Sequence, residues 1–274
     1  MRTRPPSAER CLPTTSIMES KPNHSLVKRI ALGAAVALFW IGVWYLGALW
    51  VGKELFLPTP WAVLQALIAL IPSAEFWTIV GKSLLRVLQG YVPGLIFGAI
   101  GGLLTAKVSF LGILFSPLLT VIRATPVSSF IMLIFLLLGR DSTPAFIVFL
   151  MVLPIVWANV EQGIKTVDPS LKEVCRVYQM PWTRRLRILD LPHCMPYFSA
   201  GVLTSLGLAW KAGIAAEVLC TPKQSIGKMV YDSKVYLETA ELFAWTAVVI
   251  LLSLILEKLL KFLLERGKAR ASGA

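Results

Sequence analysis

The chain has 274 residues, of which 56% are apolar and only 15% are charged, and its net charge is +12. Soluble domains have about 25% charged and 45–50% apolar residues, so this composition excludes a disordered or fibrous chain and argues against a soluble globular enzyme. Four scattered Cys and only two His give neither a disulfide framework nor a multi-histidine metal centre.

The first 29 residues are expected to form a disordered cytoplasmic tail, because they are polar and contain several Pro and Ser. They have no apolar core, which argues against a secretory signal peptide. Translation could begin at Met1 or at Met18, and the sequence leaves both open.

Apolar runs with few charges recur along the rest of the chain, and about 20 such residues cross the hydrocarbon core of a bilayer. They predict an all-α integral membrane protein with about six transmembrane helices, near 30–52, 85–106, 124–139, 143–162, 194–218 and 241–263. Residues 30–264 would form this membrane domain, and 265–274 a cytoplasmic C-terminal tail.

The third of these spans is interrupted by Arg123 and Pro126. Proline disfavours the helical conformation of the residue before it, here Thr125. We therefore predict a helix at 110–122 that lies at the membrane surface, with the span starting near Ala124. One long tilted helix buried in protein is the alternative.

The basic residues gather in 1–29, in 164–192 and from Lys258 onward. With both termini cytoplasmic, six spans place these clusters, together with Lys107 and Arg123, on the cytoplasmic side. That side then holds 19 of the 27 Lys and Arg, which is the positive-inside pattern. It accounts for the charge better than nucleic-acid binding, and most of these residues would only set the topology.

The loop between the fourth and fifth spans carries an amphipathic pattern. Its apolar residues recur at helical spacing, at Leu171, Val174, Cys175 and Tyr178. Its polar residues fall on the other face, at Lys172, Glu173, Arg176 and Gln179. A second short helix is predicted after Pro181 and should close at Leu191-Pro192. This helix–turn–helix suits either a groove of a cytosolic partner or a surface of anionic lipid.

The same loop resembles the cytoplasmic signature of permease subunits of ABC importers: Glu-Ala-Ala, three residues, Gly, nine residues, Ile, any residue, Leu-Pro. Glu173-Val174-Cys175 stands at its first position, and Leu189-Asp190-Leu191-Pro192 follows at the family spacing. Gln179 replaces the Gly, which would permit a left-handed turn that Gln disfavours.

Further stretches resemble permeases of the nitrate, sulfonate and taurine type. They are Leu57-Pro58-Thr59-Pro60, Arg123-Ala124-Thr125-Pro126, and Gly207 to Glu217 with the following Ser225-Ile226-Gly227. The resemblance covers roughly residues 30 to 264.

The resemblance implies a homodimeric permease in the cell membrane that works with ATP-binding-cassette ATPase subunits and an extracytoplasmic solute-binding protein. This chain would bind no cofactor and hold no enzymatic activity, since ATP and Mg belong to the ATPase subunit. The loop would be the coupling element, with the expected ATPase contacts Glu173, Arg176, Tyr178, Gln179, Met180 and Trp182.

Two charged residues fall within or near the outer half of the fifth span, Lys211 and Glu217. A central Lys costs about 2.5–3.5 kcal/mol on insertion scales, so it should face protein or a water-filled path. The side chains of Lys211 and Glu217 point in directions about 120° apart around a helix. The two residues therefore form no i,i+4 pair, and each needs its own partner. With Trp210 they are candidates for the translocation path, where Lys211 would favour an anion. Alternatively, Lys211 snorkels or neutralises a structural carboxylate.

Small residues recur every fourth position in the second span, at Gly94, Gly98 and Gly102. Such a stripe lets another backbone approach closely. Packing within the chain, a dimer seam and a pore lining all fit it.

These observations predict the membrane subunit of an ABC importer that moves a small anionic solute by ATP-driven alternating access. An ion-coupled secondary transporter, with Lys211 and Glu217 as coupling groups, is the competing class. A membrane-embedded enzyme is a third class, for which we find neither paired carboxylates nor a Walker A motif.

Overall fold

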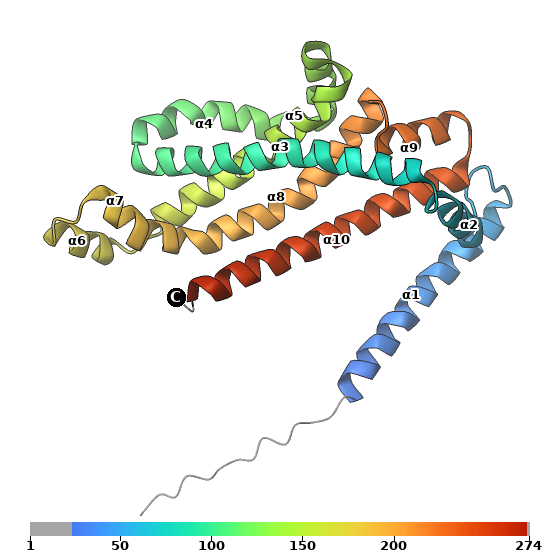
Figure 1. Cartoon of the computed structure of the whole chain (residues 1–274), viewed down its shortest axis with the longest axis horizontal. Coiled ribbons are helices and arrows are strands. Elements are labelled where there is room, and N and C mark those ends of the chain that lie inside the picture. The colour runs from blue at the N-terminus through green and yellow to red at the C-terminus, as the bar shows by residue number, and fades with distance from the viewer. Residues whose placement is uncertain (1–23, 273–274) are drawn as a thin grey trace, which may run out of the picture. The chain divides into compact units, whose positions relative to one another are not determined.

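The computed structural model describes residues 24–272, and the regular elements in that range are helices (Figure 1). The chain separates into two units at Leu46 and Gly47. Helix α1, His24–Val51, accounts for the described part of the first unit and runs on into the second. It begins inside the segment predicted as a tail, whereas residues 1–23, with the alternative starts Met1 and Met18, lie outside the described residues.

The second unit contains α2 to α10, with bounds Pro60–Leu70, Ala74–Lys107, Ser109–Ala124, Val127–Lys165, Pro169–Val177, Trp182–Arg185, Leu191–Cys220, Ile226–Val235 and Thr239–Ser272. Hydroxyl caps start several of them. Thr59 caps α2 through Ala62 N–H, and Ser73 accepts from Phe76 N–H at 3.1 Å to cap α3. The prediction of an all-helical chain is confirmed for the described residues.

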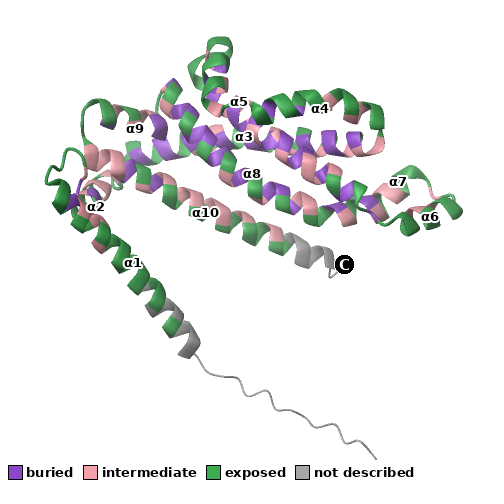
Figure 2. Cartoon of the chain, turned by 180° about the vertical axis from the view of Figure 1, so that it is seen from behind, coloured by how far each residue is buried: buried purple, intermediate pink, exposed green. Residues whose placement is uncertain are grey.

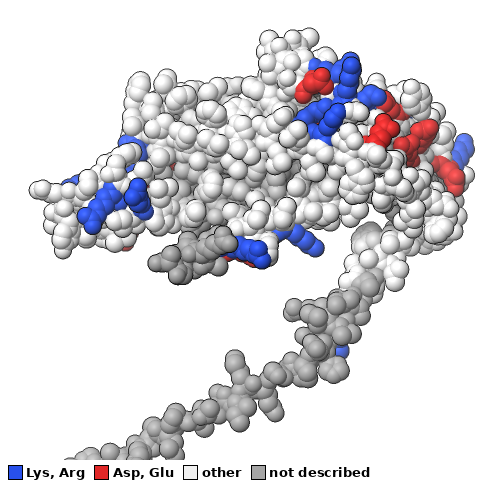
Figure 3. Space-filling view, in the orientation of Figure 1, with Lys and Arg blue, Asp and Glu red and all other residues white. Residues whose placement is uncertain are grey.

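Within the described residues, three helices are long and apolar enough to cross a membrane: 74–107, 127–165 and 182–220. Large apolar side chains stay exposed on this unit, including Leu136 at 81% and Ile113 at 76%. Figure 3 shows charged side chains at the α6–α7 end and near α9, with a mostly uncharged belt between them on that face. This distribution is typical of a surface in contact with lipid.

The core lies where α3, α5 and α8 pack together, and the buried residues in Figure 2 follow these three helices. The glycine stripe of α3 faces α5 of the same chain. A Cβ on Gly98 would stand 2.9 Å from the carbonyl oxygen of Leu153, and one on Gly102 would stand 2.5 Å from that of Trp157. Gly94 packs likewise against Val152. The two backbones therefore touch, which only a residue without a side chain permits.

Helix α4, Ser109–Ala124, covers the segment that the sequence predicted as a helix at 110–122. The break before Pro126 is confirmed, because Thr125 is extended at φ −77° and ψ 131°. Helix α4 runs back along α3 in both views (Figures 1 and 2), and Arg123 on it donates to the carbonyl oxygen of Pro154 in α5 at 2.8 Å. Only Leu119 and Ile122 of α4 are buried, whereas Phe110 and Ile113 stay exposed, so its position at the membrane surface stays a prediction.

Helix α5 bends sharply at Gly139, whose φ of 75° and ψ of −176° are non-helical. The part before it, 127–138, is about 18 Å long at 1.5 Å per residue, too short to cross a core of about 30 Å. This part of the helix is therefore too short to cross alone, and the number of crossings stays a prediction. Ile131 and Ile134 of this part pack in one cluster with Cys220 at the end of α8, so it continues from α4 toward the α9 end.

The predicted closure at Leu191-Pro192 is also wrong. Residues Trp182 to Cys220 form one continuous helical rod, in which a π-turn, η1 (Leu186–Asp190), joins α7 to α8. Leu191 N–H donates to Leu186 O five residues back. This wider register accommodates Pro192, which has no N–H to donate and would otherwise disturb the α-helical ladder.

Candidate functional site

The α6–α7 hairpin follows the cap of Asp168. The carboxylate oxygen Oδ1 of Asp168 accepts from the hydroxyl and from the N–H of Ser170, both at 2.8 Å. These hydrogen bonds hold the pKa of Asp168 below its usual value, so the cap stays charged at neutral pH. Pro169 then occupies the first turn, where its missing N–H costs nothing. The N-terminus of α6 is therefore determined by the local sequence at 168–170.

Gln179 makes the turn between α6 and α7. Its φ is +46°, the left-handed region where the family signature has Gly. Two hydrogen bonds close the helix end: Gln179 N–H donates to Arg176 O at 3.0 Å, and Met180 N–H donates to Cys175 O at 2.9 Å. This is a Schellman motif. Gln179 thus forms the turn for which the family signature has Gly, and it does so in a conformation that is unfavourable for a residue with a side chain.

Replacing Gln179 by Gly should stabilise the hairpin by about 1 kcal/mol, since a left-handed conformation costs a non-glycine residue roughly that much. Deuterium exchange of the peptide covering 169–185 should slow by about fivefold in the purified protein. Gln162→Gly, inside α5 and exposed, is the matched control and should speed local exchange, because Gly weakens a helix interior. Faster exchange of 169–185 in the Gln179→Gly variant would contradict the assignment of strain.

The hairpin exposes its apolar face. No residue of α6 is buried, and Val177 and Tyr178 are 75% and 76% exposed. Val174 and Trp182 are also exposed, at 49% and 56%. The other residues predicted here, Glu173, Arg176 and Gln179, are exposed, and Met180 is half-buried. Both faces of the hairpin are therefore accessible, and the described part of the chain leaves them uncovered.

A buried ion pair ties the hairpin to the bundle. Asp190, at the end of η1, is fully buried and pairs with Lys107 at the end of α3. Arg185 of α7 lies 3.8 Å away, measured from its Nε to the same carboxylate oxygen of Asp190. The sequence assigned Lys107 to topology alone and Asp190 no role, although Asp190 stands inside the Leu-Asp-Leu-Pro of the signature.

Glu217 forms a second network, at the α9 end of the bundle. Its Oε2 accepts from Ser83 Oγ at 2.8 Å and from Gly227 N–H at 3.2 Å, and its Oε1 lies 3.4 Å from Arg86 Nη1. Ser83 Oγ in turn accepts from Ile226 N–H at 2.9 Å. The carboxylate thus joins α3, α8 and the start of α9. The sequence did not identify Arg86, which stands one residue before the uncharged run of the second span.

The three residues predicted to line a path fall in different places. Glu217 is buried against Arg86, and Trp210 is buried in the core, where its Nε1 donates to Val249 O at 3.1 Å. Lys211 is exposed on α8. Lys211 and Glu217 form no ion pair with each other, as their angular separation predicted, and Arg86 is the partner of Glu217.

The fold and the hairpin define a multi-pass helical membrane protein with an exposed amphipathic hairpin between two long helices. A family model described as "binding-protein-dependent transport system inner membrane component" matches residues 94–268, more than half of the chain. The chain belongs to this family, which confirms the resemblance seen in the loop.

Two relatives agree with this assignment, and one solved structure has a similar fold. The taurine transport system permease protein TauC of Escherichia coli (strain K12) is 23% identical over 249 residues, covering 88% of this chain and 90% of TauC. The nitrate import permease protein NrtB of Leptolyngbya laminosa is 29% identical over 193 residues, covering 70% and 68%. A bacterial ABC transporter involved in the import of the acidic polysaccharide alginate has a chain of similar fold, with a TM-score of 0.59 at 14% identity and coverage of 88% and 98%.

Proposed function

We propose that this permease imports a small anionic solute by ATP-driven alternating access, with α6 as the element that couples it to an ATPase subunit. The observation that carries the proposal is the exposed amphipathic hairpin between two long helices. Amphipathic helices of this kind bind grooves of partner proteins through apolar anchors at i, i+3 and i+4, and Val174, Val177 and Tyr178 have that spacing.

The proposed topology has six crossings with both termini in the cytoplasm. α1, α3, the second part of α5, α8 and α10 provide five of them. The third crossing is a broken one, formed by α4 and continued by 127–138. The α6–α7 end would then face the cytoplasm, because it carries Lys107, Lys165 and the arginines of α7. In this topology Arg123 would lie outside the cytoplasmic cluster.

Force from the ATPase would enter through α6 and leave through two connections. One is the continuous rod from Trp182 to Cys220, which makes α7 and α8 a single body. The other is the pair of Asp190 with Lys107, which links that rod to α3. A push on the hairpin therefore reaches two core helices at once, as rigid-body alternating access requires.

The partners we propose are two ATPase subunits, an extracytoplasmic solute-binding protein, a second copy of the permease and the surrounding bilayer. ATP and Mg would be bound by the ATPase. The relatives' names include nitrate and taurine transport, and both solutes carry an anionic oxygen group, which supports an anion for this chain. No observation favours ion-coupled transport, since Glu217, which that class would use, is enclosed by Arg86 and Ser83.

Uptake into proteoliposomes tests this function. The permease is reconstituted with the ATPase and the binding protein of the same transport system, and uptake of taurine, nitrate, bicarbonate and ethanesulfonate is measured. We expect uptake of at least one of them only when ATP and all three proteins are present. Uptake by the permease alone, driven by a proton or sodium gradient, would overturn the proposal in favour of a secondary transporter.

A further inference from the structure

Arg123 extends from α4 toward α5, and its side chain is exposed in this chain. It contacts Pro154 of α5, eleven residues before the end of that helix at Lys165, which corresponds to about 16 Å at 1.5 Å per residue. This is about half of a 30 Å hydrocarbon core. A charged side chain at that depth is costly and marks a functional site unless it is neutralised.

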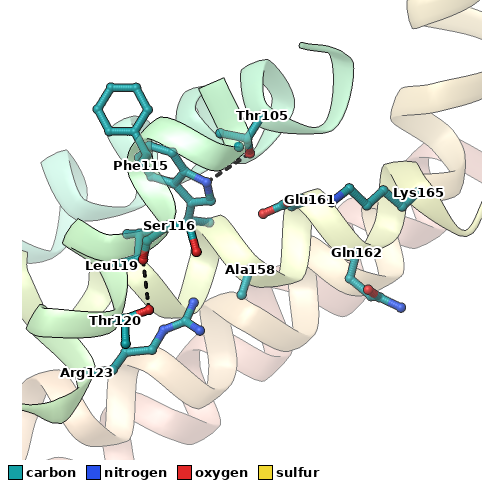
Figure 4. A pocket seen from close by; sticks show the side chains of 12 residues that line it. Thr105, Phe115, Ser116, Leu119, Thr120, Arg123, Ala158, Glu161, Gln162 and Lys165 are labelled. Atoms are coloured by element: carbon teal, nitrogen blue, oxygen red, sulfur yellow. Dashed lines mark hydrogen bonds and ion pairs between the residues drawn. The ribbon is translucent and has the colours of Figure 1, made fainter. Parts of the chain in front are cut away.

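Arg123 faces a cavity of about 300 Å³ between α4 and α5. Figure 4 shows Arg123, Thr120 and Ser116 of α4 on one side and Ala158 and Glu161 of α5 on the other. Hydroxyl and guanidinium groups therefore meet in a membrane-depth cavity. The helix break at Thr125-Pro126 follows directly, and such breaks are tolerated at this depth where the backbone is buried in protein or lines a cavity.

The cavity carries an excess of positive charge. Glu161 is neutralised by Lys165, with Oε1 and Nζ 2.5 Å apart. Among the side chains that the structure describes, no carboxylate pairs with Arg123. One N–H group of Arg123 donates to Pro154 O. A guanidinium has five N–H donors in a planar fork, so donors remain for a ligand.

We propose that this cavity binds the transported solute as a small oxyanion, held by the guanidinium of Arg123. This inference rests on the proposed function and adds the place of binding to it. The planar fork matches the paired oxygens of a nitrate, bicarbonate or sulfonate group. Ser116 supplies a further hydroxyl, whereas the hydroxyl of Thr120 already donates to Ser116 O at 2.8 Å. A lipid headgroup does not reach the middle of the bilayer, so the ligand is a free solute.

The test measures thermal unfolding of the permease–ATPase complex in phosphatidylcholine nanodiscs without binding protein. Sodium nitrate, bicarbonate, taurine and ethanesulfonate are titrated at ionic strength held constant with sodium chloride. We expect at least one of them to raise the unfolding midpoint saturably. Arg123→Gln should need at least a tenfold higher concentration for the same rise, and Arg123→Lys an intermediate one.

Two further variants keep the test decisive. Ala158→Leu fills the cavity without touching the charge and should also weaken the shift, whereas Arg140→Gln removes an exposed arginine of α5 outside the cavity and should behave as wild type. No saturable shift in the wild type, or equal half-saturation in Arg123→Gln, overturns the site. If Arg123→Gln does not fold, equal half-saturation in Arg123→Lys and Ala158→Leu overturns it.

The outcomes separate this inference from the proposed function. ATP-dependent uptake with anion binding that does not depend on Arg123 refutes the site and leaves the importer standing. Arg123-dependent anion binding without ATP-dependent uptake refutes the importer and leaves the anion site standing.

Discussion

Replacing Arg86 by Met is expected to destabilise the purified permease by about 3–5 kcal/mol, because removal of one partner leaves a buried charge without compensation. The partner left behind is Glu217, which is 1% exposed, whereas Arg86 itself is 14% exposed. Arg86 also donates to Lys223 O at 2.8 Å and to Gln224 O at 3.3 Å. The substitution therefore also releases the loop before α9.

The double variant Arg86→Met/Glu217→Gln separates these contributions. It removes both charges, so it should regain a large part of the loss, and the cycle of single and double variants measures the coupling. Unfolding in mixed micelles of increasing SDS, followed by circular dichroism, provides the free energies. Arg140→Met is the control for losing an exposed arginine. If Arg86→Met lowers the free energy of unfolding by less than 1 kcal/mol, solvent and not Arg86 compensates the charge of Glu217.

This network shows what the sequence could not predict. Glu217 and Lys211 were recognisable as charges in an apolar run, and their angular separation correctly excluded a direct pair. The partner of Glu217 is 131 positions away in the chain. No local pattern connects two such positions, because only the packing of α3 against α8 brings them together. The same holds for Lys107 and Asp190, 83 positions apart.

The spacing of residues along the chain predicted those features that depend on a single helix face. The spacing of Gly94, Gly98 and Gly102 predicted a close helix contact, although not which helix supplies it. The residues of α6 predicted an amphipathic helix, and the missing Gly pointed to the strained turn at Gln179. The direction of α4 was not predictable, since an apolar helix after Lys107 can lie on the membrane or along the bundle. The contact of Arg123 with Pro154 was therefore not predictable either.

Two acidic residues on the exposed face of α6 should abolish coupling. In Val174→Glu/Tyr178→Glu, both side chains lie on the face that we propose to fill a groove of the ATPase, and a charge buried there without a partner is strongly unfavourable. We expect the ATPase to be lost from the purified complex and ATP-dependent uptake to fall at least tenfold. Because both residues are exposed, the free permease should unfold within about 0.5 kcal/mol of wild type.

Lys172→Gln provides the matched control, because it lies on the opposite face of the same helix and should retain both the ATPase and uptake. A fall in uptake with the ATPase still bound would place the defect in force transmission, along the rod from Trp182 to Cys220. Wild-type uptake by Val174→Glu/Tyr178→Glu would exclude the apolar face of α6 as the docking surface. The exposed hairpin would then have to be explained by contact with lipid, the alternative that its amphipathic pattern also allowed.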